Sequence, residues 1–231
     1  MEGERADDLW CDWAERIWGL FPARQVCWFA RYNRKLLQYA NDSVRKKTHG
    51  MEQRVDFYHF SQKYVKDLGP LEDYAQPKEL KTLKVHKELA SLIMMKNQLI
   101  AVDETLRDII EDLEPGVHQF WPMKITMPKD QTYPVPYYGM VIHTHLASFR
   151  LEGSDPASAR PDAYAGEGVD VISTSRSALA GLAMSREAAD GKHIWREKHI
   201  LRPWLFMSDE LVARIKDAGL KMPKHYPMKA V

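Results

Sequence analysis

The sequence has 231 residues and a formal net charge of +1, with 45% hydrophobic and 28% charged residues. This composition is typical of a globular protein and excludes intrinsic disorder along the whole chain. The balanced charge excludes a global field that would draw the protein to nucleic acid or to an anionic membrane. No apolar run approaches the roughly 18 residues that a membrane-spanning helix needs.

The start of the sequence and its cysteines indicate the cellular compartment. The first eight residues are mainly acidic, whereas a secretory signal begins with basic residues and continues with an apolar run. The two cysteines, Cys11 and Cys27, both lie within apolar patterns, which favours reduced thiols over a disulfide framework. We therefore expect a cytoplasmic protein.

A helical hairpin is predicted at the start of the chain. Four apolar residues recur there at helical spacing: Trp10, Trp13, Ile17 and Phe21. Pro22 then suits the first turn of a second helix. We expect residues 1–54 to form an N-terminal helical extension and residues 55–231 to form the main domain.

The centre of the chain carries a clear strand and helix signal. Residues 99–102 are a compact apolar run, which predicts a strand. Asp103 is a suitable N-cap for a helix over residues 103–113, whose apolar positions recur at helical spacing. Pro115 and Gly116 are expected to end this helix.

The remaining residues predict mainly extended structure, and the fold class is α+β. We expect a mixed or antiparallel sheet with short amphipathic helices. Six further segments carry weaker signals: an extended path at 120–138, a strand at 139–149, a loop at 153–168, strands at 169–173 and 193–195, and a helix at 177–189.

Two segments of the chain resemble each other. Residues 99–106 and residues 204–211 both read as an apolar run, a polar cap and a leucine, at an offset of 105 residues. At the same offset, Trp121-Pro122-Met123 corresponds to Tyr226-Pro227-Met228. Each copy therefore predicts a strand, a capped helix and a second strand that includes a proline.

No motif for catalysis is present in the sequence. It contains no nucleophile elbow, phosphate-binding loop, dinucleotide-binding glycine pattern or Cys-x-x-Cys pair. His143 and His145 alternate on a predicted strand, but no third ligand follows at metal-binding spacing. We expect no catalytic residue, metal or cofactor. An enzyme that uses His118, His143, His145 or His193 stays open as an alternative, because a site can assemble from distant residues.

Three segments resemble a known family. They are Glu111-Asp-Leu-Glu-Pro-Gly-Val-His-Gln-Phe-Trp-Pro-Met123, Gly191-Lys-His-Ile-Trp-Arg196, and Leu205-Phe-Met-Ser-Asp-Glu-Leu211 with the following Tyr226-Pro-Met228. Together they resemble the eleventh immunity-protein family of bacterial polymorphic toxin systems. The resemblance covers roughly residues 78–231, and the Trp-rich residues before it match nothing in that family.

The resemblance implies a cytoplasmic antidote that blocks a toxin by direct contact. It further implies that this toxin carries a nuclease domain of the His-Met-finger type. The resemblance supplies no catalytic residue, and neither a membrane nor nucleic acid is an expected partner. Its signature residues are interpreted as determinants of the fold, so that Trp121 and Trp195 are expected in the core and Ser208 as a helix cap.

The best candidates for contact with such a toxin are four acids. A nuclease carries a basic substrate groove, and complementary charge speeds association. Residues 103–114 hold six acids and one arginine, and the exposed face of their helix presents Glu104, Asp108, Glu111 and Asp112. Two alternatives remain: contact through the Trp-rich N-terminal hairpin, or a nucleic-acid or scaffold-binding module that uses the basic residues 24–66.

Overall fold

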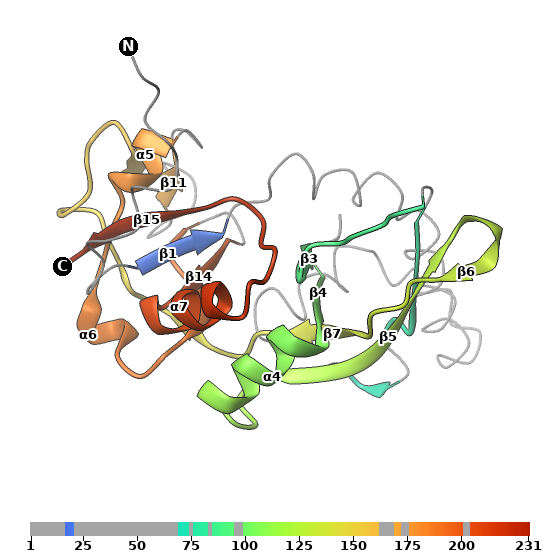
Figure 1. Ribbon diagram of the computed structural model, residues 1–231. Coiled ribbons are helices and arrows are strands. Elements are labelled where there is room, and N and C mark those ends of the chain that lie inside the picture. Colours follow the sequence, from blue (N-terminus) through green and yellow to red (C-terminus); the bar gives the residue numbers. More distant parts are fainter. Residues whose placement is uncertain are drawn as a thin grey trace, which may run out of the picture.

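The computed structural model describes residues 17–20, 69–73, 76–82, 85–94, 99–161, 169–171, 176–200 and 204–231. These residues form two larger β-sheets, a small two-stranded sheet and a few short helices (Figure 1). The fold class is therefore α+β with mixed sheets, as the sequence predicts. Within the described residues, no helix is long and apolar enough to cross a membrane.

The first large sheet has six strands. Five follow the order β2-β5-β7-β4-β3, and β6 pairs with β5. Only the β2–β5 pair is parallel. The strands are β2 (Glu79–Lys81), β3 (Leu92–Met94), β4 (Ile100–Asp103), β5 (Gln119–Met127), β6 (Gln131–Thr132) and β7 (Tyr137–Val141). The turn η3 (Pro128–Asp130) joins β5 to β6.

The second large sheet has seven strands in the order β8-β13-β14-β1-β15-β12-β9. The β12–β15 and β13–β8 pairs are parallel. The strands are β1 (Ile17–Leu20), β8 (His145–Leu146), β9 (Phe149–Arg150), β12 (Ala183–Met184), β13 (Ile194–Glu197), β14 (Leu205–Met207) and β15 (His225–Ala230). A separate hairpin pairs β10 (Ala159–Pro161) with β11 (Val169–Val171).

Two longer capped helices follow strands of the two large sheets. In α4 (Glu104–Leu113), the side chain of Asp103 accepts a hydrogen bond from the backbone N–H of Leu106. In α7 (Asp209–Asp217), Ser208 accepts one from the N–H of Leu211 in the same way. Such caps satisfy donors that the first turn of a helix leaves without partners. Two shorter helices are α5 (Arg176–Ala180) and α6 (Arg186–Ala189).

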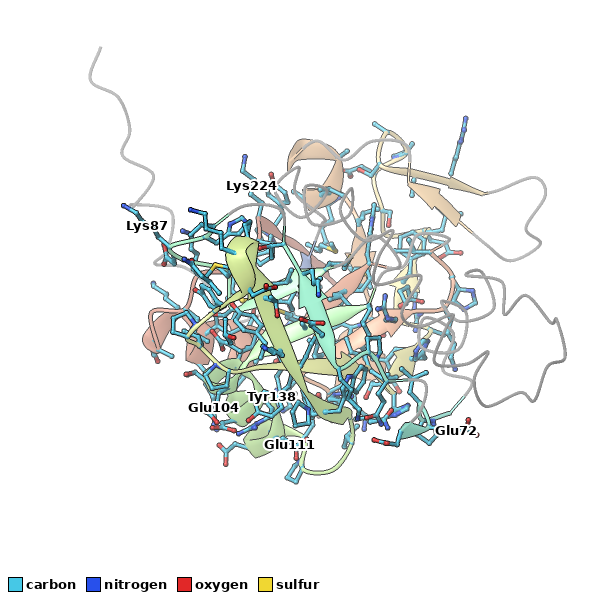
Figure 2. The ribbon with its side chains drawn as sticks, turned by 90° about the vertical axis from the view of Figure 1, so that its right-hand side faces the viewer. Glu72, Lys87, Glu104, Glu111, Tyr138 and Lys224 are labelled. Carbon is cyan, nitrogen blue, oxygen red and sulfur yellow. The ribbon has the colours of Figure 1, made fainter. Side chains whose placement is uncertain are left out.

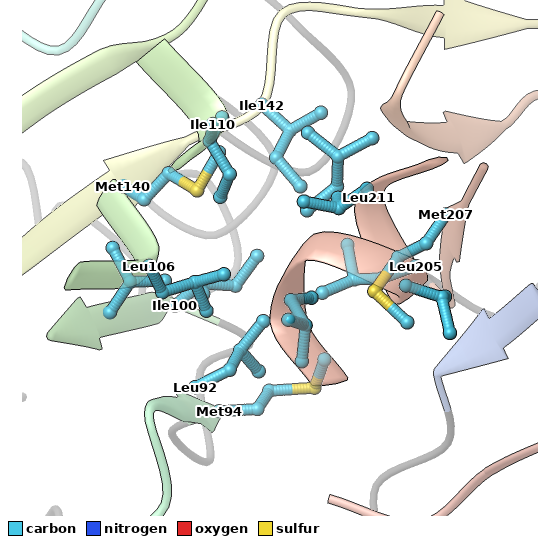
Figure 3. Close-up of a cluster of buried hydrophobic side chains, with 14 residues drawn as sticks. Leu92, Met94, Ile100, Leu106, Ile110, Met140, Ile142, Leu205, Met207 and Leu211 are labelled. Carbon is cyan, nitrogen blue, oxygen red and sulfur yellow. The ribbon is translucent and has the colours of Figure 1, made fainter. Parts of the chain in front are cut away.

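The two sheets and the two capped helices share one hydrophobic core (Figure 3). The helices α4 and α7 contact each other within it. Their contributions include Leu106 and Ile110 from α4 and Leu211 and Ile215 from α7, all buried. The apolar stripe predicted for residues 103–113 is thus confirmed, and so is Ser208 as a cap. The burial of these side chains leaves the polar face of α4 toward solvent.

Each large sheet has a second core on its other face. In the six-stranded sheet this core includes Trp121, and in the seven-stranded sheet it includes Trp195 stacked on Phe206 with ring centroids 6.0 Å apart. Trp121 and Trp195 are 3% and 0% exposed, so the prediction that they lie in the core is confirmed.

Gly139 in β7 lies directly against the ring of Trp121. A Cβ atom at this position would come within 2.3 Å of two ring carbons, which is far inside van der Waals contact. We expect Gly139→Ala to lower the free energy of unfolding by about 1–3 kcal/mol through overpacking. Urea denaturation measures this loss. Gly116→Ala is a poor control because its positive φ adds strain, so Thr132→Ala on exposed β6 is preferred.

The structure corrects the predicted N-terminal helical hairpin at four residues. Ile17–Leu20 forms β1, which is hydrogen-bonded to β14 on one side and to β15 on the other. The helical spacing is overridden here by pairing on both sides, since β-strand preference depends mainly on neighbouring strands. The rest of 1–54 lies outside the described residues, and the division into 1–54 and 55–231 stays a prediction.

The predicted strand over residues 139–149 is also wrong in its extent. The strand ends at Val141, and only short strands follow at β8 and β9. Side chains take the backbone donors that a continuous ladder would use. His118 accepts from the N–H of His143, and Glu197 accepts from those of Ser148 and Phe149.

Two weaker predictions are partly corrected in the same region. The predicted loop 153–168 includes strand β10, and the predicted helix 177–189 consists of two short helices with β12 between them. Gly181 lies at this interruption, where a Cβ atom would come within 2.2 Å of the Ser158 hydroxyl. Close packing therefore requires a glycine at the point where the predicted helix is interrupted.

Candidate functional site

The four predicted acids lie on or near the solvent-facing side of α4. The side chains of Glu104, Asp108 and Asp112 are 50%, 61% and 69% exposed, and Glu111 is half-buried. Figure 2 shows Glu104, Glu111 and Tyr138 on the same side of the molecule, and the hydroxyl of Tyr138 donates to Glu104. The carboxylates thus form one surface, which we call the acidic face: Glu104, Asp108, Glu111 and Asp112.

Arg107 lies within the acidic face and neutralises part of it. Its guanidinium donates to Asp108 Oδ1 through Nε at 2.9 Å, and its Nη2 lies 3.8 Å from Glu104 Oε1. The same group stacks 4.0 Å from the ring centre of Tyr138, whose hydroxyl donates to Glu104 at 3.3 Å. Arg107 is therefore held by two carboxylates and one aromatic ring.

Arg214 neutralises part of the negative charge at the other end of the acidic face. It belongs to α7 and donates to Asp112 of α4, while its Nη2 lies 3.5 Å from Glu210. The hydrogen bond to Asp112 raises the pKa of Arg214 above its ordinary value. Exposed pairs of this kind contribute little to the stability of a fold, because solvent screens them. The main effect of the Arg214–Asp112 hydrogen bond is to hold α4 against α7.

The acidic face is accordingly less charged than the sequence alone suggests. Its four carboxylates have two guanidinium groups as neighbours, which leaves a net charge of −2. Repulsion between the acids is relieved inside the molecule, so an external basic partner is not required to explain their presence. Within the described part of the chain, Glu111 alone of the four has no ion pair.

A fifth acid, Glu114, follows α4 and is buried. Its Oε2 lies 3.1 Å from His118 Nε2 and accepts the backbone N–H of Ile194 at 3.0 Å. The side chain of His118 is fully buried, and its Nδ1 accepts the N–H of His143. Because Nδ1 accepts, Nε2 carries the hydrogen and donates to Glu114. The network joins the end of α4 to β13 of the other sheet.

Two opposing effects act on the pKa of Glu114. Burial alone would raise this pKa. The hydrogen bond from His118, the attraction between the two side chains and the backbone N–H groups of Ile194 and His193 lower it by a larger amount. The net result is a pKa below the ordinary value. Glu114 is thus held as a buried carboxylate, and among the described residues its Oε1 has no hydrogen-bond partner.

The candidate histidines do not meet in one site. His118 pairs with Glu114, whereas His145 Nε2 lies 3.2 Å from the carbonyl oxygen of Ile142. His193 Nδ1 lies 2.9 Å from the hydroxyl of Ser208. His143 contributes its backbone N–H to His118. In the described ranges, no three His, Cys, Asp or Glu side chains are grouped as metal ligands.

Several of these groups are not identifiable from the sequence. The partners Tyr138 and Arg214 come from distant segments, and no local pattern indicates them. Glu114 and His118 are four residues apart, a spacing that brings side chains together in helical structure, and this was the one available signal for that pair. The basic residues 24–66 and the Trp-rich hairpin fall outside the described residues, apart from β1 within the hairpin.

Comparison with known proteins identifies the family. The immunity protein family Imm11 matches residues 32–230, which is most of the chain. The match begins well before residue 78, where the resemblance was expected to start. No curated protein matches the chain. The matched range includes the acidic face, the Glu114 network and both large sheets except β1. The chain belongs to the Imm11 immunity protein family.

Proposed function

We propose that this protein is a cytoplasmic immunity protein that binds and neutralises a cognate toxin by direct contact. The family match over residues 32–230 carries the proposal. The toxin is a nuclease of the His-Met-finger type, and the chain itself performs no catalytic step. Co-expression tests it: the toxin encoded beside this gene should kill cells alone and spare them when this protein is present. Survival without a complex on co-purification would contradict inhibition by contact.

We place the contact on the acidic face of α4. Figure 2 shows Glu104, Glu111 and Tyr138 on the lower side of the molecule, and Lys87 and Lys224 on its upper left side. A basic nuclease groove would approach the acidic face, because complementary charge steers association. The ring of Tyr138 and the Arg107 guanidinium stacked on it add the residue types that dominate binding energy at interfaces.

Reversal of charge on the acidic face is expected to slow toxin association. In Glu104→Lys/Asp108→Lys/Glu111→Lys, three carboxylates become cations, while Asp112 keeps its pair with Arg214. We expect an association rate about tenfold lower at low salt, and a weaker dependence of that rate on salt. The reason is that the variant loses the electrostatic steering that speeds association at low salt. Stopped-flow mixing with catalytically inactive toxin at several salt concentrations measures both quantities.

A matched control separates this surface from general charge effects. Glu152, Glu187 and Asp190 are exposed acids outside α4, and their reversal to lysine changes the net charge by the same amount. The control variant should keep most of the parental association rate. If the α4 variant protects cells and associates as fast as the parent, the contact lies elsewhere, and the Trp-rich N-terminal residues are tested next.

A further inference from the structure

Five strands in each large sheet have the same arrangement. In the first sheet the order is β2-β5-β7-β4-β3, and in the second it is β12-β15-β1-β14-β13. The outer pairs β2–β5 and β12–β15 are parallel. The three remaining pairs in each series are antiparallel. The two series therefore agree in order and in every strand direction.

The helices and their flanking strands repeat at a constant offset. Strand β4 begins at residue 100 and β14 at 205, and α4 begins at 104 and α7 at 209, so both differ by 105. The caps Asp103 and Ser208 also differ by 105, and each accepts the N–H three residues later. Leu106 and Ile110 are buried, as are their equivalents Leu211 and Ile215.

The two faces of the sheets also correspond. The buried side chains of Ile100 and Val102, and of their equivalents Leu205 and Met207, all belong to the core that the sheets share. The residues between them, Ala101 and Phe206, belong to the outer cores. The units thus pack with their helix-bearing faces toward each other, as Figure 3 shows for the shared core.

The central strand follows the same register in both units, although its position along the chain differs. In the first unit β7 pairs Gly139 with Trp121 and with Ala101. In the second unit β1 pairs Gly19 with Tyr226 and with Phe206. Tyr226 and Phe206 are the offset equivalents of Trp121 and Ala101. The remaining pairs of β1 also have equivalents in β7. For example, Trp18 is paired with Pro227, and Tyr138 is paired with Pro122.

The sequences of the two central strands match under this register. The segment Tyr137-Tyr-Gly-Met140 aligns with Ile17-Trp-Gly-Leu20, and the glycine falls third in both. Gly139 is required because any Cβ would strike the Trp121 ring. Gly19 occupies the same position opposite an aromatic residue of β15. Topology, offset, core and register therefore all support the same correspondence between the two units.

We propose that the chain contains two copies of one five-stranded unit, and that the gap between β14 and β15 is a strand-binding site. The chain's own N-terminal segment, Ile17–Leu20, occupies this site as β7 occupies its equivalent. The ligand chemistry is an extended peptide with a bulky residue followed by glycine, bound through main-chain hydrogen bonds. The inference is independent of toxin binding, and it assigns part of residues 1–54 to the second unit.

The strand fills a position that would otherwise be unfavourable. Without it, β14 and β15 would each present a row of backbone N–H and C=O groups without strand partners in the middle of a sheet. The second unit therefore closes only when residues from the opposite end of the chain arrive. We expect Gly19→Ala to destabilise the protein as Gly139→Ala does, because the two glycines hold equivalent positions.

Engineered disulfides in the full chain test the register. In a background with Cys11 and Cys27 replaced by serine, Trp18→Cys/Pro227→Cys places two thiols at directly opposed positions. Opposed antiparallel residues have Cα atoms about 4.5–5.5 Å apart, which suits a disulfide. The equivalent pair in the first unit, Pro122→Cys/Tyr138→Cys, is the positive control. Leu20→Cys/Met228→Cys is out of register by three residues, roughly 10 Å along the strand, and is the negative control.

We expect the cysteine pairs at 18 and 227 and at 122 and 138 to lose their free thiols on mild oxidation. The pair at 20 and 228 should keep them. Tryptic mass spectrometry identifies each link. Failure of the 18–227 pair beside a formed 122–138 link would overturn the proposal, as would equal formation of the 18–227 and 20–228 links. Hydrogen exchange of the unmodified chain gives a second measurement. Slow exchange at residues 18–20, comparable to β7, supports the proposal, and exchange at the rate of an unfolded chain overturns it.

Discussion

Replacement of Glu114 by alanine is expected to lower the free energy of unfolding by about 2–6 kcal/mol, since it leaves two buried donors without an acceptor. The change removes the acceptor of both His118 Nε2–H and the N–H of Ile194. Buried donors left without acceptors account for much of such a cost. Urea denaturation followed by tryptophan fluorescence measures the loss.

Two comparisons make the Glu114 result specific. Glu111→Ala, at a half-buried acid on the preceding turn, should cost less than about 1 kcal/mol, because Glu111 has no ion pair among the described residues. Glu114→Gln keeps an oxygen acceptor and should fall between the two. Equal stability of Glu114→Ala and Glu111→Ala would show that the buried network contributes nothing.

The same carboxylate predicts a pH dependence of stability. The pKa of Glu114 lies below the ordinary value of 4.5 in the folded chain, so the unfolded chain takes up its proton first as the pH falls. The contribution is complete above about pH 4.5 and is lost as the pH falls through the lowered pKa. Unfolding measured between pH 3 and pH 7 should therefore show a smaller difference between the parent and Glu114→Gln at the acidic end.

The parts of the fold that the sequence predicts well have strong local signals. Residues 99–113 combine an apolar run, a capping aspartate and a helical stripe, and all three are present in β4 and α4. The repeated pattern at 204–211 predicts β14 and α7 for the same reasons. Local propensity and tertiary packing agree in these segments, and such agreement makes an element predictable.

The incorrect predictions concern segments whose structure depends on distant partners. Ile17–Leu20 forms a strand because β14 and β15 lie on both sides of it, and no residue near it in sequence indicates those partners. The chain after Val141 leaves the sheet because His118 and Glu197 accept its N–H groups. In both cases the deciding interaction spans tens of residues or more.

The candidate site also has features that the sequence predicts and features that depend on distant partners. The acidic positions on α4 follow from the helical period alone, and the structure places Glu104, Asp108 and Asp112 toward solvent as that period predicts. Compensation by Arg214 could not be predicted, because it requires α7 to pack against α4. The two arginines relieve the repulsion between the acids inside the molecule, and the remaining negative charge can still steer a basic partner.

Trp195→Ala is expected to cost about 3–5 kcal/mol of folding free energy, the range for removal of a large aromatic side chain from a core. Trp195 is fully buried, stacks on Phe206 and donates from Nε1 to the Ser148 hydroxyl. Ser148 in turn donates to the buried carboxylate of Glu197, so the change also loosens the corner before β9. The melting temperature should fall by roughly 6–20 °C for a domain of this size.

The decisive comparison for Trp195 is stability against toxin affinity. We expect the folded fraction of Trp195→Ala to bind toxin with the parental Kd at a temperature well below its midpoint, because a fully buried ring cannot contact a partner in the native state. Trp195→Phe keeps the stacking and should recover part of the lost stability. A Trp195→Ala variant that retains its melting temperature but loses toxin binding would instead identify this residue as a contact, and would require the seven-stranded sheet to open when the toxin binds.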